Sequence, residues 1–285
     1  MKRWGAVAAV AALIAALPRS AAAVDTVPFT QTENGLIEVQ ASVDNQPAVP
    51  MLLDLGAGVD VLSTALGRRL VNVNGKYVSL RLTGERADIP IGTVVAFAIG
   101  DVGIEAPHVG IWSGLDGTPY VGMISATAFR NITATFDYRN NKLTIEDAQT
   151  FPARKLNAVR VPLVLQDDLG IALGVFARFD FGNGKSGLCE IDTGAHGITI
   201  DKALAPMLGV NLNAPGVEHA SAPSGDTVRA KIASIGLTGA PQTTIHAPTV
   251  TFGNLIYDCN VGNEFWTGRS FTLDLPDRAI FIPAT

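Results

Sequence analysis

The sequence predicts a mostly β protein built from two homologous lobes with a cleft between them. Runs of four to eight residues rich in Val, Ile, Thr and Phe, separated by Gly, Pro, Asn and Asp, recur along the 285 residues. Few stretches keep a helical period for three turns. The chain also repeats itself at a spacing of about 140 residues, which is too long for a solenoid and fits two similar lobes.

The clearest part of the repeat is an aspartate at a glycine turn. Residues 51–62 match residues 189–200, within the stretch 188–200, at an offset of 138 (192 − 54), which sets Asp54 against Asp192. At the same offset the alternating run 37–43 matches 175–181, and turn residues follow both runs. This pattern predicts, in each half, a hairpin whose second strand ends at the aspartate. Residues 136–145 then match residues 273–282 at an offset of 137. Because the offset changes by only one residue over more than a hundred positions, the similarity of the two halves indicates a duplication.

The first 23 residues resemble an export signal. Lys2 and Arg3 precede an apolar stretch of 14 residues from Trp4 to Leu17, and three alanines at 21–23 supply a small-residue cleavage site. The apolar stretch is short for a bilayer, although an uncleaved membrane anchor is the alternative. We therefore expect a periplasmic or extracellular protein. Cleavage would leave 18 basic and 26 acidic residues, a formal charge of −8, which argues against nucleic acid as a partner.

The remaining chain suits two domains of ordinary size. The polar stretch 149–157 lacks apolar alternation and predicts a boundary there, giving an N-terminal lobe at 24–150 and a C-terminal lobe at 151–285. Short helices are expected at 63–70, 126–129 and 201–208. An exported protein could pair its two cysteines, Cys189 and Cys259, but the sequence leaves this open.

Both aspartate turns resemble a known family. Asp54-Leu55-Gly56-Ala57 and Asp192-Thr193-Gly194-Ala195 are similar to the active-site loops of retropepsin-like aspartic proteases, including bacterial tandem-lobe, gag-polyprotein-protease-like forms. A second family element, an apolar pair closed by glycine, is matched at 258–262 and again at 121–125, where Ser125 replaces the glycine. The resemblance covers nearly all of residues 30–283. It implies two retropepsin/pepsin-like β-barrel lobes, each with a hairpin flap, at 78–95 and 220–232.

The resemblance implies an endopeptidase that hydrolyses polypeptides with Asp54 and Asp192 as its catalytic pair. Two carboxyl groups about 3 Å apart cannot both ionise, so one can take a proton from water while the other supplies a proton. No metal or organic cofactor is implied, and one chain suffices because it contributes both aspartates. The membrane would be a partner only if the leader stays uncleaved. The residues expected to support the active-site loops are Leu55, Gly56, Ala57, Thr193, Gly194 and Ala195.

Leu55 departs from the family pattern. The family has threonine at this position, and its hydroxyl bonds to the opposite loop. Leucine removes one arm of that reciprocal contact, and an unsatisfied buried partner costs roughly 1–3 kcal/mol. The alternatives are therefore a catalytically impaired peptide-binding module and an envelope assembly protein that uses the same cleft.

Other polar residues near the turns have simpler interpretations. Asp60 and Asp201 are expected to be surface acids or turn formers. His196 adjoins the second turn and is either an exposed loop residue or a substrate contact. The four histidines show no paired spacing typical of a metal site.

Overall fold

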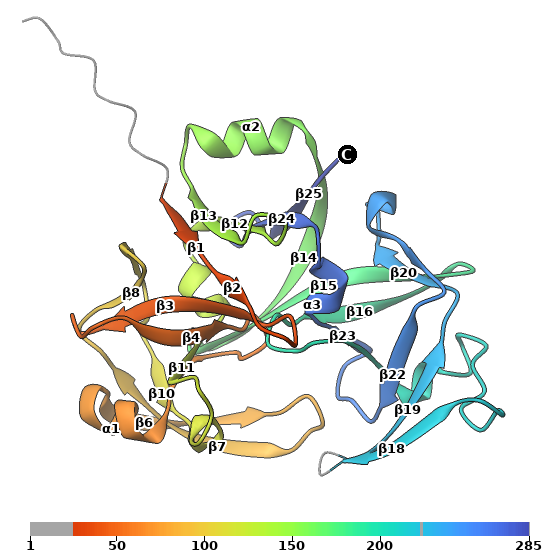
Figure 1. The fold of residues 1–285 in the computed structure, drawn as a ribbon, viewed down its shortest axis with the longest axis horizontal. Coiled ribbons are helices and arrows are strands. Elements are labelled where there is room, and N and C mark those ends of the chain that lie inside the picture. The colour runs from red at the N-terminus through yellow and green to blue at the C-terminus, as the bar shows by residue number, and fades with distance from the viewer. Residues whose placement is uncertain (1–24, 223–224, 285) are drawn as a thin grey trace, which may run out of the picture.

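The computed structural model describes residues 25–222 and 225–284, so the predicted signal peptide lies outside the described residues. Two large sheets dominate the fold, which confirms the mostly β prediction (Figure 1). The helices in this part of the chain are short: α1 (Thr64–Leu70), α2 (Thr150–Leu156) and α3 (Asn263–Trp266). Within the same residues, no helix is long and apolar enough to cross a membrane.

The first sheet has ten strands from the N-terminal half, in the order β6-β7-β10-β5-β11-β4-β3-β8-β9, with β2 paired to β3. Its strands are β2 (Thr30–Gln31), β3 (Ile37–Val43), β4 (Val49–Leu53), β5 (Asp60–Leu62), β6 (Asn72–Leu80), β7 (Arg86–Thr93), β8 (Phe97–Ile99), β9 (Val102–Ile104), β10 (Val109–Ile111) and β11 (Gly122–Ile124).

The second sheet has fifteen strands and joins both halves. Its main order is β1-β13-β12-β24-β25-β14-β15-β16-β23-β17-β22-β19-β18, and β20 pairs with β15 and β21. Its strands are β1 (Thr26–Pro28), β12 (Thr133–Asp137), β13 (Lys142–Glu146), β14 (Ala158–Asp168), β15 (Ala172–Gly182), β16 (Lys185–Ile191), β17 (Ile198–Asp201), β18 (Glu218–Ala222), β19 (Gly225–Lys231), β20 (Ser234–Leu237), β21 (Ile245–His246), β22 (Thr249–Gly253), β23 (Cys259–Val261), β24 (Ser270–Asp274) and β25 (Ala279–Pro283).

The duplication is visible where the halves meet, at the antiparallel pair β12 and β24. Thr135 faces Thr272 at the centre of this pair, and their hydroxyl oxygens are 2.7 Å apart. The two threonines are 137 positions apart, the offset predicted for this part of the repeat. An approximate two-fold axis therefore passes between them. Aromatic rings close the core on both sides of it, with Phe136 stacked on Phe271 at 4.9 Å.

Each half carries a long hairpin in the region where the family resemblance implies a flap. Strands β6 and β7 form the first, and its tip at 81–85 closes with a hydrogen bond of 2.8 Å from the Arg81 N–H to the Glu85 carbonyl. Strands β18 and β19 form the second. Both hairpins extend towards the lower centre of the view in Figure 1.

The expected helices are only partly present. α1 forms as predicted, but 126–129 and the start of 201–208 are 3₁₀ turns, Ala126–Phe129 and Lys202–Leu204. Pro206 lacks a backbone N–H and so disfavours a helix across 201–208. The polar stretch 149–157, predicted as the boundary between the lobes, contains the helix α2. The Asp147 carboxylate explains this, because it accepts the Gln149 and Thr150 N–H groups at the start of the helix, both at 2.8 Å.

Cys189 and Cys259 form a disulfide, with their Cα atoms 4.5 Å apart. They face each other in the register of the parallel strands β16 and β23. Cys189 lies three residues before Asp192, and Cys259 precedes Asn260, which binds the Asp192 carboxylate at 2.6 Å. The disulfide therefore fixes the two strands that bring these side chains together.

Replacing both cysteines with alanine should destabilise the protein by about 2–4 kcal/mol, because the bridge closes a chain segment with a sequence separation of 70. Denaturant unfolding of the variant and of the wild type, each with and without a reducing agent, measures this. Reduction should shift only the wild type. An equal midpoint for all four samples would show that the bridge does not support the fold.

Candidate active site

The two predicted aspartates occupy equivalent places at the ends of strands. Asp54 follows β4 and Asp192 follows β16. The Asp54 N–H donates to the Ile124 carbonyl at 2.8 Å, and the Asp192 N–H donates to the Val261 carbonyl at 3.0 Å. Ile124 and Val261 belong to the two apolar elements that the family resemblance set beside the turns. Each aspartate is therefore held by the element predicted to pack against it.

The structure brings the two carboxyl groups together. A Cβ atom added to Gly56 would lie 2.6 Å from the Asp192 carboxyl carbon, and one added to Gly194 would overlap the carboxyl group of Asp54. Each glycine thus lies against the aspartate of the other half, where no larger residue fits. Each aspartate also accepts the N–H of its own glycine, at 2.9 Å for Asp54 and 2.8 Å for Asp192.

A single threonine joins the two turns. The Thr193 hydroxyl accepts the Leu55 N–H at 3.0 Å and donates to the Leu53 carbonyl at 2.7 Å. Thr193 is completely buried. Leu55 is also completely buried and packs in the hydrophobic core, so it offers no matching hydrogen bond. One arm of the expected reciprocal contact is present and the other is absent, as the sequence predicted.

The surroundings of the Asp54 carboxyl group favour its protonated form. Burial raises the pKa of Asp54 well above its usual range, and the negative charge of Asp192 and a hydrogen bond to Asp192 raise it further. Asp54 is only 6% exposed, whereas Asp192 is half-buried. The Asn260 amide donates to Oδ2 of Asp192 at 2.6 Å.

A polar pair in the second half replaces an apolar pair in the first. Glu190 faces Asn260 across the parallel strands β16 and β23. At the equivalent place in the first half, Leu52 faces Met123 across β4 and β11. Sequence analysis missed Glu190 and Asn260, although comparing the aligned copies residue by residue would have shown Glu190 opposite Leu52. The two halves therefore give their aspartates different surroundings.

Glu190 adds a third carboxyl group beside the pair. It is 7% exposed. Burial and the charge of Asp192 raise its pKa to about 8, although its hydrogen bond with Asn260 lowers the pKa. Glu190 is therefore neutral over most of the physiological range, and its neutral form adds no negative charge beside Asp192.

Asp60 corrects the sequence interpretation, because it is completely buried rather than at the surface. It accepts the Ser125 N–H at 2.7 Å and the Thr127 hydroxyl at 3.0 Å. Burial outweighs these hydrogen bonds and raises the pKa of Asp60 to about 6. Asp60 thereby anchors the segment after β11, where Ser125 replaces the family's glycine. Asp201 is a turn former as expected, since its carboxylate accepts the Ala203 N–H at 2.7 Å.

Two further residues fix the second turn. The Asn263 amide donates to the Ala195 carbonyl at 3.1 Å and also binds the Thr193 carbonyl at 2.5 Å. His196 is exposed, and its Nδ1 lies 2.6 Å from the carbonyl oxygen of Asn34 in the first half. The imidazole thus links the second turn to the β2–β3 connection.

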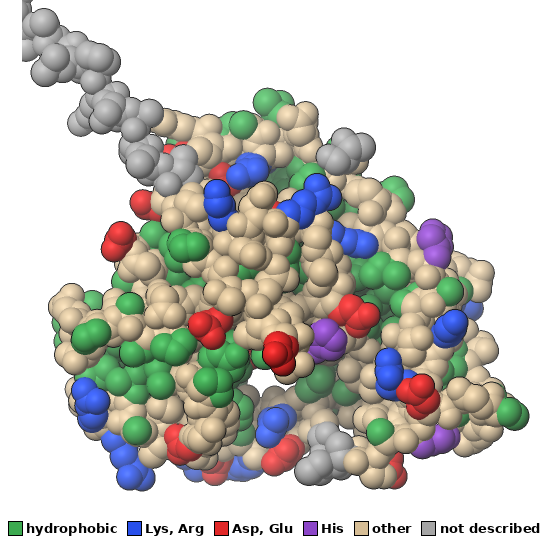
Figure 2. All heavy atoms as spheres, in the orientation of Figure 1, with side chains coloured by type: hydrophobic (Ala, Val, Ile, Leu, Met, Phe, Trp, Pro, Cys, Tyr) green, Lys and Arg blue, Asp and Glu red, His purple; other side chains and the backbone are tan. Residues whose placement is uncertain are grey.

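The surface has an opening at the boundary of the two halves. Figure 2 shows an opening between the two halves at the lower centre of the view. The tip of the β6–β7 hairpin spans to the other half, where the Ile256 N–H donates to the Leu82 carbonyl at 3.0 Å. A cavity of about 480 Å³ opens near Ile256, lined also by Phe176, Leu188 and Tyr257. The halves also touch through the β14–β15 hairpin, whose Asp167 pairs with Arg130.

Known structures share this architecture. The chain is similar to an aspartic proteinase from Irpex lacteus, with a TM-score of 0.54 and 14% identity over 92% of this chain and 98% of that chain. It is also similar to basic 7S globulin from soybean, with a TM-score of 0.52 and 12% identity over 91% and 94% of the two chains. No protein-family model and no curated protein matches the sequence. The predicted two-lobed fold is confirmed as the bilobal fold of pepsin-like aspartic proteinases.

Replacing Thr193 with valine should destabilise the protein by about 2–4 kcal/mol, because it leaves the Leu55 N–H and the Leu53 carbonyl buried without a partner. Urea unfolding measures the loss. Thr199→Val is a matched control, because the Thr199 hydroxyl makes no hydrogen bond within the described residues. Equal losses in the two variants would rule out a special role for the Thr193 contact.

Replacing Glu190 with glutamine should stabilise the protein at pH 8 by on the order of 3 kcal/mol and leave it unchanged at pH 4. The folded pKa of about 8 exceeds the ordinary value of 4.5, so the wild type loses stability as the pH rises between these values, whereas glutamine stays neutral. Thermal unfolding of both proteins across this range is the measurement. The exposed Glu33→Gln serves as control, and a pH-independent difference for Glu190→Gln would contradict the raised pKa.

Proposed function

We propose that this protein is an aspartic endopeptidase that hydrolyses polypeptides, with Asp54 and Asp192 as its catalytic pair. The observation that carries the proposal is the mutual approach of the two turns, in which each glycine lies against the carboxyl group of the other half. The pepsin-like fold supports the proposal, but the sequence identity to the proteinase is only 14%, so the fold alone does not establish activity. The function therefore rests on the site.

The asymmetry around the pair supports separate roles for its members. In the proposed mechanism, Asp192 is ionised, stabilised by Asn260, and takes a proton from a water molecule held between the carboxyl groups. Asp54 carries the shared proton and gives it to the carbonyl oxygen of the peptide bond. The water oxygen attacks the carbonyl carbon and forms a tetrahedral diol. Its C–N bond then breaks as the nitrogen accepts the proton that Asp192 took from water, and one hydroxyl of the diol returns its proton to Asp54 as the new carboxyl group forms.

The hairpins and the cleft support an extended peptide as substrate. A strand-like peptide can form backbone hydrogen bonds with a covering hairpin, so that selectivity falls on its side chains. The β6–β7 hairpin already spans the opening through Leu82 and Ile256. Closure of such an element would exclude water from the reaction.

Three finer features belong to the same proposal. We place the protein with the retropepsin-like type because alanine follows the glycine in both turns, at Ala57 and Ala195. We propose export to the periplasm or beyond, supported by the leader-like sequence and by the Cys189–Cys259 disulfide. We keep the lobe division at 150/151 and a single chain as the working unit, because that chain supplies both aspartates.

The second candidate function is peptide binding without catalysis. The observation that favours it is Leu55, which leaves the two turns with one cross-lobe arm instead of two. A looser pair of turns would still offer a cleft. The two candidates differ only in turnover, so a cleavage assay separates them.

Asp54→Asn and Asp192→Asn should each lower peptide cleavage by at least about a thousandfold while leaving the fold intact. A mixed peptide library is incubated with each protein from acid to neutral pH, and products are read by mass spectrometry. A transition-state-mimicking aspartic protease inhibitor should suppress wild-type cleavage.

Asp101→Asn, an exposed position remote in sequence from both turns, is the matched control and should cleave as the wild type does. Thermal unfolding verifies that each variant is folded. A folded wild type that binds peptides and never cleaves them would favour the second candidate. Full activity in either active-site variant would remove that aspartate from the mechanism.

A further inference from the structure

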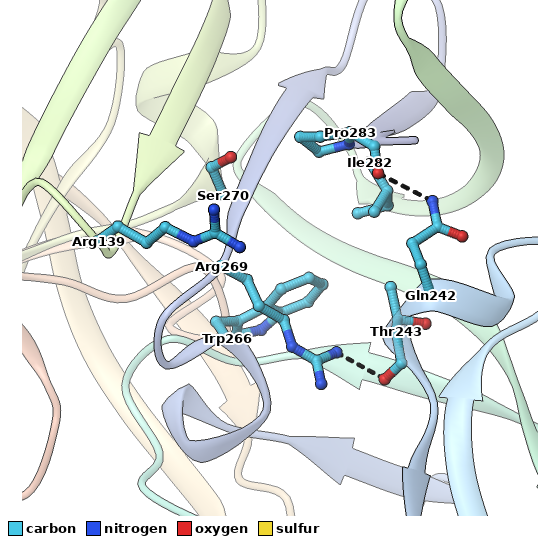
Figure 3. A pocket seen from close by; sticks show the side chains of 8 residues that line it. All are labelled: Arg139, Gln242, Thr243, Trp266, Arg269, Ser270, Ile282 and Pro283. Atoms are coloured by element: carbon cyan, nitrogen blue, oxygen red, sulfur yellow. Dashed lines mark hydrogen bonds between the residues drawn. The ribbon is translucent and has the colours of Figure 1, made fainter. Parts of the chain in front are cut away.

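A cavity outside the aspartate site has the composition of an anion-binding pocket. It has a volume of about 260 Å³, several times the roughly 30 Å³ that one water molecule occupies in the liquid. None of the residues that form it belongs to the two aspartate turns. The lining residues, shown in Figure 3, are Arg139, Gln242, Thr243, Trp266, Arg269, Ser270, Ile282 and Pro283.

Two guanidinium groups enter this cavity without an acidic partner. Arg139 comes from the β12–β13 turn and enters from one side, where its guanidinium lies near Ser270, whereas the Arg269 guanidinium points towards Thr243 (Figure 3). Neither arginine forms a salt bridge with any residue that the structure describes, and no acidic residue lines the cavity. Burial lowers the pKa of Arg269, which shows that its charge is partly removed from water. Two like charges in one half-enclosed space favour an anion between them.

The guanidinium groups are held in place and keep donors to spare. Arg139 donates its Nε–H to the Gly268 carbonyl at 2.5 Å, and Arg269 donates from Nη1 to the Thr243 carbonyl at 2.5 Å. Because a guanidinium has five N–H donors, each arginine retains several for a ligand. The side chain of Trp266 is fully buried, and its indole N–H has no acceptor in the described structure. The lining is therefore rich in donors fixed by backbone contacts.

The remaining wall is apolar. Trp266 and Ile282 are buried behind it, and the exposed Pro283 supplies aliphatic surface next to the arginines. An inorganic anion would leave this surface in contact with water, whereas an organic acid would cover it. Arginine pairs well with the planar carboxylate group, which accepts two parallel hydrogen bonds.

We propose that this cavity is a binding site for a small organic carboxylate, with the carboxylate between Arg139 and Arg269 and its apolar body against Pro283 and the edge of Ile282. The site is separate from the proposed catalytic pair. Its occupancy can therefore be measured whether or not the protein cleaves peptides.

Isothermal titration calorimetry of the full chain with hexanoate tests the proposal. Hexanamide has a similar apolar body without charge, and inorganic phosphate has charge without an apolar body. Hexanoate should bind with a saturable isotherm that is tighter than either comparison ligand. Arg139→Gln and Arg269→Gln should each weaken hexanoate binding by about tenfold or more. The exposed Arg69→Gln in α1 removes the same charge elsewhere and should bind as the wild type does.

Because Arg269 also holds the Thr243 carbonyl, the exposed Arg139→Gln carries the test if Arg269→Gln fails to fold. Absence of saturable hexanoate binding to the wild type would overturn the proposal. It would also be overturned if phosphate bound at least as tightly as hexanoate, or if Arg139→Gln bound as the wild type does.

Discussion

The hydrogen bonds of the Thr193 hydroxyl are the constraint on which the rest of the site depends. Through them a side chain of the second half holds the backbone on both sides of Asp54, at Leu53 and Leu55. The contact is completely buried, so water does not compete for it. This contact fixes the separation of the two turns. At that separation each turn needs a glycine, Gly56 or Gly194, where its backbone meets the carboxyl group of the other half. A shared proton follows only if this separation holds.

The two halves have diverged around a common backbone. At the level of strands they remain related by an approximate two-fold axis, marked by the facing pair Thr135 and Thr272. At the level of side chains, the first half surrounds its aspartate with apolar groups and the second half supplies Asn260 and a neutral Glu190. Burial and the charge of Asp192 raise the pKa of Asp54, whereas Asp192 accepts a further hydrogen bond from the Asn260 amide. The duplication thus gives two equivalent aspartates different surroundings, and the proposed mechanism assigns them different roles.

The repeat made much of this architecture predictable. The 138-residue offset located both turns, and the strand ahead of each one followed from alternation and turn residues. Asp60 was misassigned because its burial depends on the segment after β11, which folds back over it from 65 residues away. Glu190 was missed because the strand alternates as any half-buried strand does, and only the register with Asn260 reveals its neighbours. The disulfide needed a Cα separation, and the arginine cavity needed the packing of four segments distant in sequence, neither of which a linear pattern contains.

The proposed sharing of a proton between the halves can be tested directly. Carbon-13 NMR of labelled aspartate carboxyl groups, recorded against pH for the wild type and for Asp192→Asn, follows Asp54 without requiring a substrate. Burial and the charge of Asp192 both raise the pKa of Asp54 in the wild type, so removing that charge should lower it while the fold persists. An Asp54 carboxyl that titrates in its ordinary range, and at the same pH in both proteins, would contradict the coupling of the two turns.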